Sequence, residues 1–292
     1  MKRILLFVLT NVAIMIMLSI VLGLLGVGGY MTPGGLDYGA LMVFSLVWGF
    51  GGAMISLAIS RWIAKTAMGV QLVNGRTGQA ELEWLYQTVE QLTRKASLPM
   101  PEVGVYDSPE VNAFATGPSK KRSLVAVSSG LLRSMRREEV EGVLAHEVSH
   151  IQNGDMVTMT LVQGVVNAFS IFFSRVIANV IRQLVDERIS HLVFFVSTIV
   201  FDIVFSLLGM VVVAWFSRAR EFRADAGAAT LSSRGNMIAA LQRLAANKGL
   251  VDNSQPQLAT MKIHGSKGKG LLALISTHPP LEDRIAALQR LS

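Results

Sequence analysis

Residues 4–27 have the sequence ILLFVLTNVAIMIMLSIVLGLLGV, in which no side chain is charged. A helix rises about 1.5 Å per residue, so ~20 such residues are enough to cross the hydrocarbon core of a bilayer. The segment is too long for the apolar part of a secretory signal, no small-residue cleavage site follows it, and another apolar run comes soon afterwards. We therefore expect a membrane anchor that is retained.

Three more apolar segments follow the first. They cover residues 39–60, about 156–181 and about 192–216. An apolar content of 51% with only 16% charged residues also favours a membrane protein over a soluble one. We expect an α-helical integral membrane protein with four transmembrane helices, namely two N-terminal spans within residues 1–60 and a transmembrane hairpin at residues 156–216.

Basic residues predict the orientation of these spans. Lys2 and Arg3 precede the first span, Arg61 and Lys65 follow the second, and Asp37 is the only charged residue in the loop between them. Lysine and arginine favour the cytoplasmic side of a membrane. Both termini and the polar parts of the chain are therefore expected in the cytoplasm.

The formal net charge of +7 could suggest a nucleic-acid partner. In a membrane protein, however, the same excess is expected where lysines and arginines face anionic lipid. We therefore expect the lipid bilayer, and no nucleic acid, as the partner of these charges. The chain has no cysteine, so a bound metal would need nitrogen and oxygen ligands.

The water-soluble part consists of residues 61–155 and 217–292, which must pack together because a membrane hairpin divides them. We expect a mainly α domain (α+β) with a small antiparallel β-sheet. Helical periodicity is found at residues 80–97, from 137 onward, and at 218–231, 236–247 and 281–291. Short β-prone runs lie at residues 103–106, 112–116 and 124–127. Residues 250–270 are rich in Gly, Ser, Lys and Asn and are expected to be mobile.

One predicted helix carries the run His146-Glu147-Val148-Ser149-His150. Histidines at i and i+4 lie on one face of a helix, so both imidazoles can bind a single tetrahedral Zn²⁺. Glu147 would then face a zinc-bound water and act as the general base that takes its proton. The same pattern also occurs by chance in unrelated helices, so a third ligand is needed to decide.

The third ligand is expected after the motif. The metzincin pattern is excluded, because Asn153 and Met156 stand where it requires glycine and histidine. The remaining candidates are Asp155, Asp186, Glu187, His191, Asp202, Glu221, Asp225, His264 and His278. The predicted topology places several of these in the opposite loop or inside a span, and it favours Glu221. Asp225 lies one turn later and would hold a ligand histidine by a hydrogen bond, or else form an exposed pair with Arg218 or Arg223.

Three motifs together point to a known family. They are residues 146–150 followed by Asn153-Gly154-Asp155, then Glu221-Phe222-Arg223-Ala224-Asp225, and finally Ser276-Thr277-His278-Pro279-Pro280 with Arg284. With these motifs in this order around four apolar segments, the chain closely resembles the HtpX-type membrane zinc metalloproteases, bacterial relatives of the CAAX-prenyl endopeptidases. The resemblance covers essentially the whole chain.

The resemblance implies a zincin-type endopeptidase with one zinc ion on His146, His150 and Glu221, and with Glu147 as base. It implies a multi-pass protein of the bacterial plasma (inner) membrane that degrades damaged or misassembled membrane proteins as part of a stress response. It also places His278 and Arg284 beside the cleft, where His278 would donate to the developing oxyanion. Alternatively, His278 caps the helix that follows.

The run Asn112-Ala113-Phe114-Ala115 resembles the edge strand that lies near the active site in this family. An exposed strand edge can bind an extended peptide by adding it as another strand. The run is therefore a candidate substrate-binding segment, and an ordinary buried strand is the alternative.

Two charges lie inside predicted spans. Arg175 and Asp202 are costly in a membrane unless they are paired, and we favour a structural ion pair over a proton path. A non-catalytic scaffold or transporter that uses these two charges is one alternative function, and a prenyl-protein endopeptidase is another. An intramembrane protease is excluded because residues 136–141, at the start of the motif helix, are too charged.

Overall fold

The computed structural model describes residues 2–27, 29–32, 35–246 and 274–291. The chain divides into two compact units. The helical unit consists of residues 1–56 and 159–213, and the mixed unit consists of residues 57–158 and 214–292. The segment at residues 250–270 and the candidate His264 lie outside the described residues.

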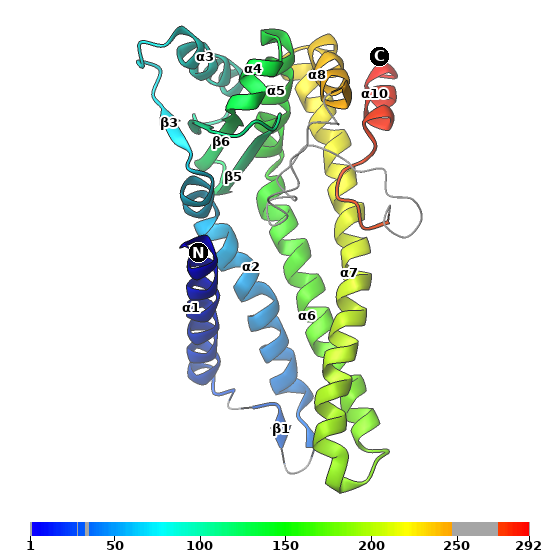
Figure 1. Ribbon diagram of the computed structural model, residues 1–292. Helices are drawn as coiled ribbons and strands as arrows, with labels where there is room; N and C mark the ends of the chain where they lie inside the picture. Colours follow the sequence, from blue (N-terminus) through cyan, green and yellow to red (C-terminus); the bar gives the residue numbers. More distant parts are fainter. Residues whose placement is uncertain (1, 28, 33–34, 247–273, 292) are drawn as a thin grey trace. The chain divides into compact units, whose positions relative to one another are not determined.

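The helical unit contains α1 (Lys2–Leu24) and most of α2 (Tyr38–Met68), α6 (Asp155–Arg182) and α7 (Glu187–Leu231). A two-stranded hairpin, β1 (Met31–Thr32) and β2 (Gly35–Leu36), follows α1 (Figure 1). By length and apolar composition, α2, α6 and α7 can each cross a membrane. The first predicted span, which lies on α1, is not among these three helices and stays a prediction.

Glycines bring the long helices of this unit into close contact. A Cβ atom on Gly49 of α2 would lie 2.5 Å from the backbone nitrogen of Ala168 in α6, and one on Gly209 of α7 would lie 2.3 Å from a methyl group of Val166. Small residues at helix contacts are typical of membrane proteins. The outward side chains are large and apolar, such as Leu192, which is 64% exposed. This distribution suits a surface that faces lipid.

Helix α7 is longer than the sequence analysis predicted. It continues without a break from the apolar segment to Leu231, whereas a separate helix was expected at residues 218–231. No glycine or proline lies between Met210 and Ala226, so nothing in the chain interrupts the helix there.

The mixed unit contains a four-stranded sheet in the order β3-β4-β6-β5. Its strands are β3 (Gln71–Val73), β4 (Glu102–Tyr106), β5 (Ala113–Ser119) and β6 (Arg122–Ser128). The prediction of an antiparallel sheet was wrong for its centre, because β4 and β6 are parallel. Strand β5 does not pair with β4 but lies at the edge of the sheet. Strand β6 returns antiparallel to β5, fills the position between β5 and β4, and is parallel to β4.

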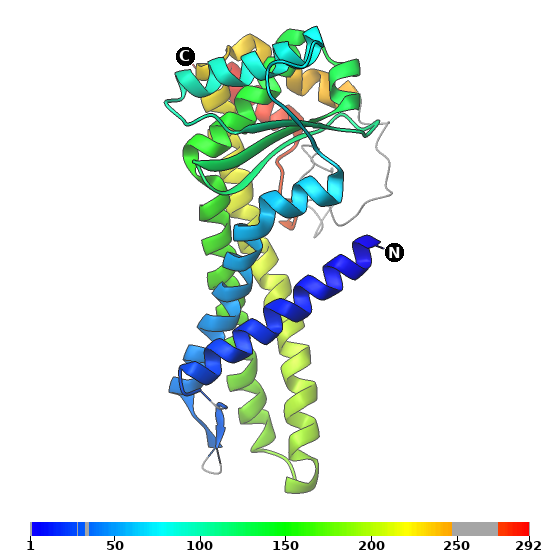
Figure 2. The same cartoon turned by 90° about the vertical axis from the view of Figure 1, so that its left-hand side faces the viewer.

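Helices cover the two faces of this sheet. Figure 2 shows α3 (Ala80–Lys95) and α8 (Arg234–Ala246) on one face, where they form a core with α5 (Arg137–Asn153). The unit also contains α4 (Ser129–Ser134) and α10 (Leu281–Gln289). On the other face, Ala64 at the end of α2 packs against Phe114 and Leu124 of the strands. The predicted small sheet within a mainly helical protein is thus confirmed.

Candidate metal centre

The site begins on α5, a helix with well-defined ends. At its start, the backbone N–H of Arg136 donates to the Glu139 carboxylate over 2.8 Å, and at its end Gly154 adopts a left-handed conformation with φ of 71°. The apolar residues Val143, Leu144 and Val148 of α5 are fully or almost fully buried. The helix is therefore fixed in the core, and its histidines have defined positions.

Three side chains that could bind a metal ion converge in the mixed unit. His146 and His150 are one turn apart on α5, and their Nε2 atoms lie 3.0 Å from each other. Glu221 comes from α7 and is completely buried. Its carboxylate oxygens lie 3.5 Å from His146 Nε2 and 3.4 Å from His150 Nε2. The structure therefore brings the three predicted ligands together.

These spacings fit a zinc ion. Ligand atoms at 2.0–2.2 Å from a tetrahedral Zn²⁺ are ~3.3–3.6 Å apart, and the three separations in the structure lie between 3.0 and 3.5 Å. Neither oxygen of the buried Glu221 carboxylate accepts a hydrogen bond within the described part of the chain. Two imidazole nitrogens and one carboxylate are also a common protein ligand set for zinc.

Carboxylates hold both histidines in the orientation that a metal requires. His146 Nδ1 lies 2.9 Å from Asp225, and His150 Nδ1 lies 2.7 Å from Asp155. A carboxylate only accepts hydrogen bonds, so each Nδ1 carries a proton and each Nε2 is the nitrogen that can bind a metal once it has no proton of its own. Asp225 was predicted for this role. Asp155 was considered only as a third ligand, and that alternative is wrong because its carboxylate contacts Nδ1 of His150.

The structure also excludes an exposed pair between Asp225 and Arg218 or Arg223. Asp225 is 2% exposed and binds Arg284 of α10 through two hydrogen bonds of 2.7 and 2.6 Å. Arg223 instead contacts Asp155 at 3.1 Å. Arg218 donates to the backbone carbonyls of residues 274 and 276 and so holds the segment that leads to α10.

Arg284 is the fully buried cation of this cluster. Its Nη1 lies 3.4 Å from Glu221, in addition to the two hydrogen bonds to Asp225. Burial by itself raises the pKa of Asp225, but Arg284 outweighs it and the pKa falls below its usual value. Burial likewise lowers the pKa of His146, but the carboxylates of Asp225 and Glu221 raise it to about 9. The pKa of Glu221 lies well below its usual value, because His278, His146 and His150 together outweigh its burial.

A glycine sets the distance between the two ligand-bearing helices. A Cβ atom on Gly227 of α7 would lie 2.6 Å from Oγ of Ser149 on α5. Ala224 and Ala228 on the same part of α7 are completely buried. The backbone of α7 therefore approaches α5 closely enough for Glu221 to reach the histidines.

Glu147 and His278 complete the predicted set. Glu147 is 5% exposed and directly follows His146 on α5. His278 Nδ1 lies 3.0 Å from Glu221, although neither ring nitrogen of His278 has hydrogen-bond geometry to a described residue. The alternative role of His278 as a helix cap is wrong, because Pro280 is the N-cap of α10 and receives no side-chain bond.

Comparison with protein families matches residues 79–292 to peptidase family M48, which is more than half of the chain. The chain belongs to peptidase family M48. It is 52% identical over 297 residues to a protease HtpX homolog of Bacillus subtilis (strain 168), and 48% identical over 298 residues to one of Methylacidiphilum infernorum (isolate V4). Each alignment covers 99% of this chain and 99% of the relative.

The fold is also similar to a solved structure. The crystal structure of S. mikatae Ste24p matches with a TM-score of 0.60 and 19% sequence identity. The match covers 85% of this chain and 58% of that one, and at this identity it concerns the fold alone. The family match and the HtpX relatives confirm the predicted resemblance to HtpX-type membrane proteases.

In this M48 peptidase, Arg220 is a neighbour of the site that the sequence analysis missed. Its Nη1 lies 3.2 Å from Glu221 and 3.4 Å from both ring nitrogens of His150. The only sign of this contact in the sequence was that Arg220 directly precedes Glu221. A helix places adjacent residues about 100° apart, however, so sequence adjacency alone did not show that this side chain turns toward the ligands.

The candidate substrate-binding run lies at one edge of the sheet. Ala113, Phe114 and Ala115 begin β5, and Asn112 directly precedes this strand. In the described ranges, no strand pairs with the free side of β5. The side chains of Asn112, Ala113 and Phe114 are buried, so a peptide added here would bind chiefly through backbone groups.

Proposed function

We propose that this chain is a zinc-dependent metalloendopeptidase of the bacterial plasma membrane that cleaves damaged or misassembled membrane proteins. The observation that carries the proposal is the convergence of His146, His150 and Glu221 next to Glu147 on α5. The long apolar helices α2, α6 and α7 support a membrane location. The similarity to protease HtpX homologs over the whole chain supports a role in proteolysis.

The side chains around the ligands have distinct tasks in this proposal. Zinc would act as a Lewis acid that lowers the pKa of water toward ~7. Glu147 accepts the proton of the attacking water and passes it to the leaving amine. His278, whose Nδ1 lies 3.0 Å from Glu221, would donate a hydrogen bond from Nε2 to the oxygen of the carbonyl under attack. Arg284 holds Asp225, which in turn orients His146.

The substrate would reach this site as an extended segment. We infer that it pairs with β5 along residues 112–115, where the free edge of the sheet offers unpaired backbone groups. The four apolar segments favour four transmembrane helices, and basic residues near their ends favour both termini and the active site in the cytoplasm. Cleavage is therefore expected in cytoplasmic or juxtamembrane segments of substrates.

The experiment that tests the proposal compares the wild type with Glu147→Gln, purified in detergent with the zinc content measured. We expect both proteins to bind one zinc ion, and only the wild type to cleave casein. Glu138→Gln is a matched control, since Glu138 is an exposed residue of the same helix. Equal cleavage by wild type and Glu147→Gln, or no cleavage by the zinc-loaded wild type, would contradict the assignment.

A further inference from the structure

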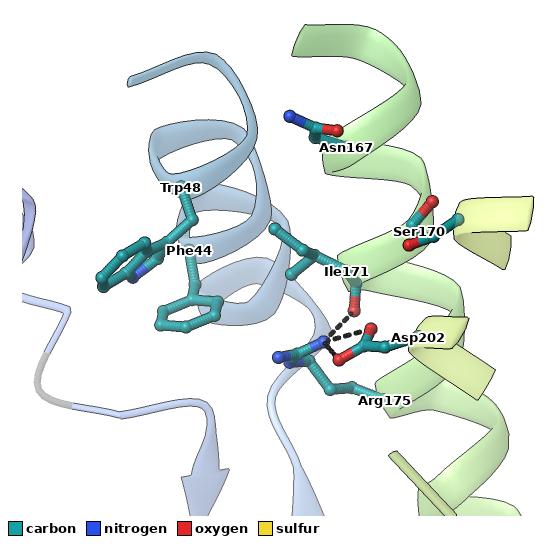
Figure 3. Close-up of a pocket in the computed structure, with 8 residues that line it drawn as sticks. Phe44, Trp48, Asn167, Ser170, Ile171, Arg175 and Asp202 are labelled. Atoms are coloured by element: carbon teal, nitrogen blue, oxygen red, sulfur yellow. Dashed lines mark hydrogen bonds and ion pairs between the residues drawn. The ribbon is translucent and has the colours of Figure 1, made fainter. Parts of the chain in front are cut away.

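Two arginines outside the ligand set differ in what they bind. In the helical unit, Nη1 of Arg175 lies 3.0 Å from the Asp202 carboxylate and also donates to the backbone carbonyl of Ile171 (Figure 3). This contact confirms the predicted ion pair, in which the two charges neutralise each other. In the mixed unit, Arg218 of α7 has no carboxylate partner within the described ranges, and its hydrogen bonds there go only to backbone carbonyls. Arg218 therefore holds a segment of chain and not an opposite charge.

The segment that Arg218 binds leads to His278. One nitrogen, Nη1, donates to the carbonyl of Leu274 over 3.1 Å and to that of Ser276 over 2.9 Å. The hydroxyl of Ser276 in turn donates to the carbonyl of His278 over 2.9 Å. The side chains of Leu274 and Ile275 are exposed, so hydrogen bonds and not core packing hold this end of the segment.

The other end of the segment is fixed in a different way. Pro279 and Leu281 are buried, and Arg284 in the first turns of α10 binds Asp225. The ring of a proline also fixes its own φ angle, which limits how the backbone can turn at this end. His278 therefore lies between one end that is packed in the core and one end that depends on Arg218.

Helix α7 places this clasp next to the metal centre. Arg218 and Glu221 are three residues apart, so they are neighbours on one face of the helix. The ring of His278 lies with Nδ1 3.0 Å from Glu221. We propose that Arg218 is a positioning residue, which holds the ring of His278 beside the metal centre through the carbonyls of residues 274 and 276. The inference rests on the proposed function, in which His278 donates to the oxygen of the carbonyl under attack.

The role predicts a loss of rate without a loss of zinc. Removal of a hydrogen-bond donor to the oxyanion lowers kcat ~100-fold to 1000-fold, and a displacement of ~1 Å of a positioned group can cost ~100-fold. Without its clasp, His278 keeps the anchor at Pro279 and still reaches its position for part of the time. Arg218→Met should therefore lower kcat about 10-fold, which is less than the loss in His278→Ala, and should leave KM and the zinc content unchanged.

Two further variants are matched to Arg218→Met in cleavage of casein by the full-length, zinc-loaded protein. Both bonds of Arg218 leave from one nitrogen, and a lysine also carries its donors on one nitrogen, so Arg218→Lys should keep most of the activity. Arg234→Met is the control, because Arg234 is an exposed arginine of α8 that donates to the carbonyl of Leu291, after α10. This control should cleave casein as the wild type does.

A double-variant cycle shows whether Arg218 acts through His278. Residues that act as a unit give effects that do not add. In the His278→Ala background, Arg218→Met should therefore change kcat less than about twofold. In the background with His278 present, the same substitution should give the full loss.

A spin label reports on the clasp without any cleavage. The chain has no cysteine, so Ile275→Cys at an exposed position of the segment accepts a label at this site alone. In the metal-free protein, the electron paramagnetic resonance spectrum should show a restrained label with Arg218 or with Arg218→Lys. The label should become mobile in Arg218→Met.

Four results would overturn the inference. They are an unchanged kcat or a loss of zinc in Arg218→Met, an equal loss of activity in Arg234→Met, losses that multiply in the double variant, and a label whose mobility does not change. Failure of the zinc-loaded wild type on casein contradicts the proposed function instead. The spin-label result does not depend on cleavage, so the two failures can be told apart.

Discussion

Removal of the Asp155 carboxylate should weaken zinc binding without a change in any ligand. Asp155 accepts a hydrogen bond of 2.7 Å from Nδ1 of His150, and the two side chains are 2% and 9% exposed. Hydrogen bonds to charged groups contribute ~1.5–3 kcal/mol, so Asp155→Ala should reduce the affinity for zinc about 10-fold to 100-fold. Asp155→Asn keeps a neutral acceptor and should lose less. Competition with a chromophoric chelator measures both affinities.

Arg223→Met serves as the control for this prediction. Arg223 is the other partner of Asp155, at 3.1 Å, but its side chain is 60% exposed. Exposed ion pairs contribute at most ~1 kcal/mol, so this variant should bind zinc almost as the wild type does. An unchanged zinc affinity in Asp155→Ala, with the fold intact by thermal unfolding, would refute the role of Asp155. A loss of equal size in Arg223→Met would show instead that the start of α6 had moved.

Three further predictions concern the same cluster. Glu221→Gln should bind zinc far more weakly, because an amide replaces a charged ligand; metal analysis that finds one zinc ion per chain at normal affinity contradicts this. Arg284→Met should lower the free energy of unfolding by ~3–5 kcal/mol, since it leaves Asp225 buried and unpaired; an unchanged melting temperature argues against it. Zinc binding to the metal-free protein below pH 9 should release about one proton from His146, whose pKa is about 9, and this release should disappear above that pH; calorimetry in buffers of different ionisation enthalpy detects it.

The sequence predicted those parts of the site that depend on helix geometry. His146 and His150 had to share one face because four residues separate them on a helix. Glu221 followed from the order of spans and polar segments. The hydrogen bond between Asp155 and His150 could not be predicted, since it depends on how α6 leaves the left-handed turn at Gly154.

The sheet shows a similar limit. The β-prone runs were found close to β4, β5 and β6, because apolar and β-branched residues mark buried strands. None of these runs predicts which strands are neighbours in the sheet. Only tertiary packing shows that β6 lies between β4 and β5, and this order makes the central pair parallel. The short strand β3 has only three residues and gave no periodic pattern.

The close approach at Gly227 has a consequence for how the enzyme acquires its metal. The contact of α7 with Ser149 is made by backbone and small side chains alone, so the protein itself sets the spacing of His146, His150 and Glu221. Small zinc-finger domains, by contrast, fold only when the ion is present. We therefore expect the chain to complete its fold first and to bind zinc as a separate, reversible step, so that metal supply controls activity without affecting the survival of the protein.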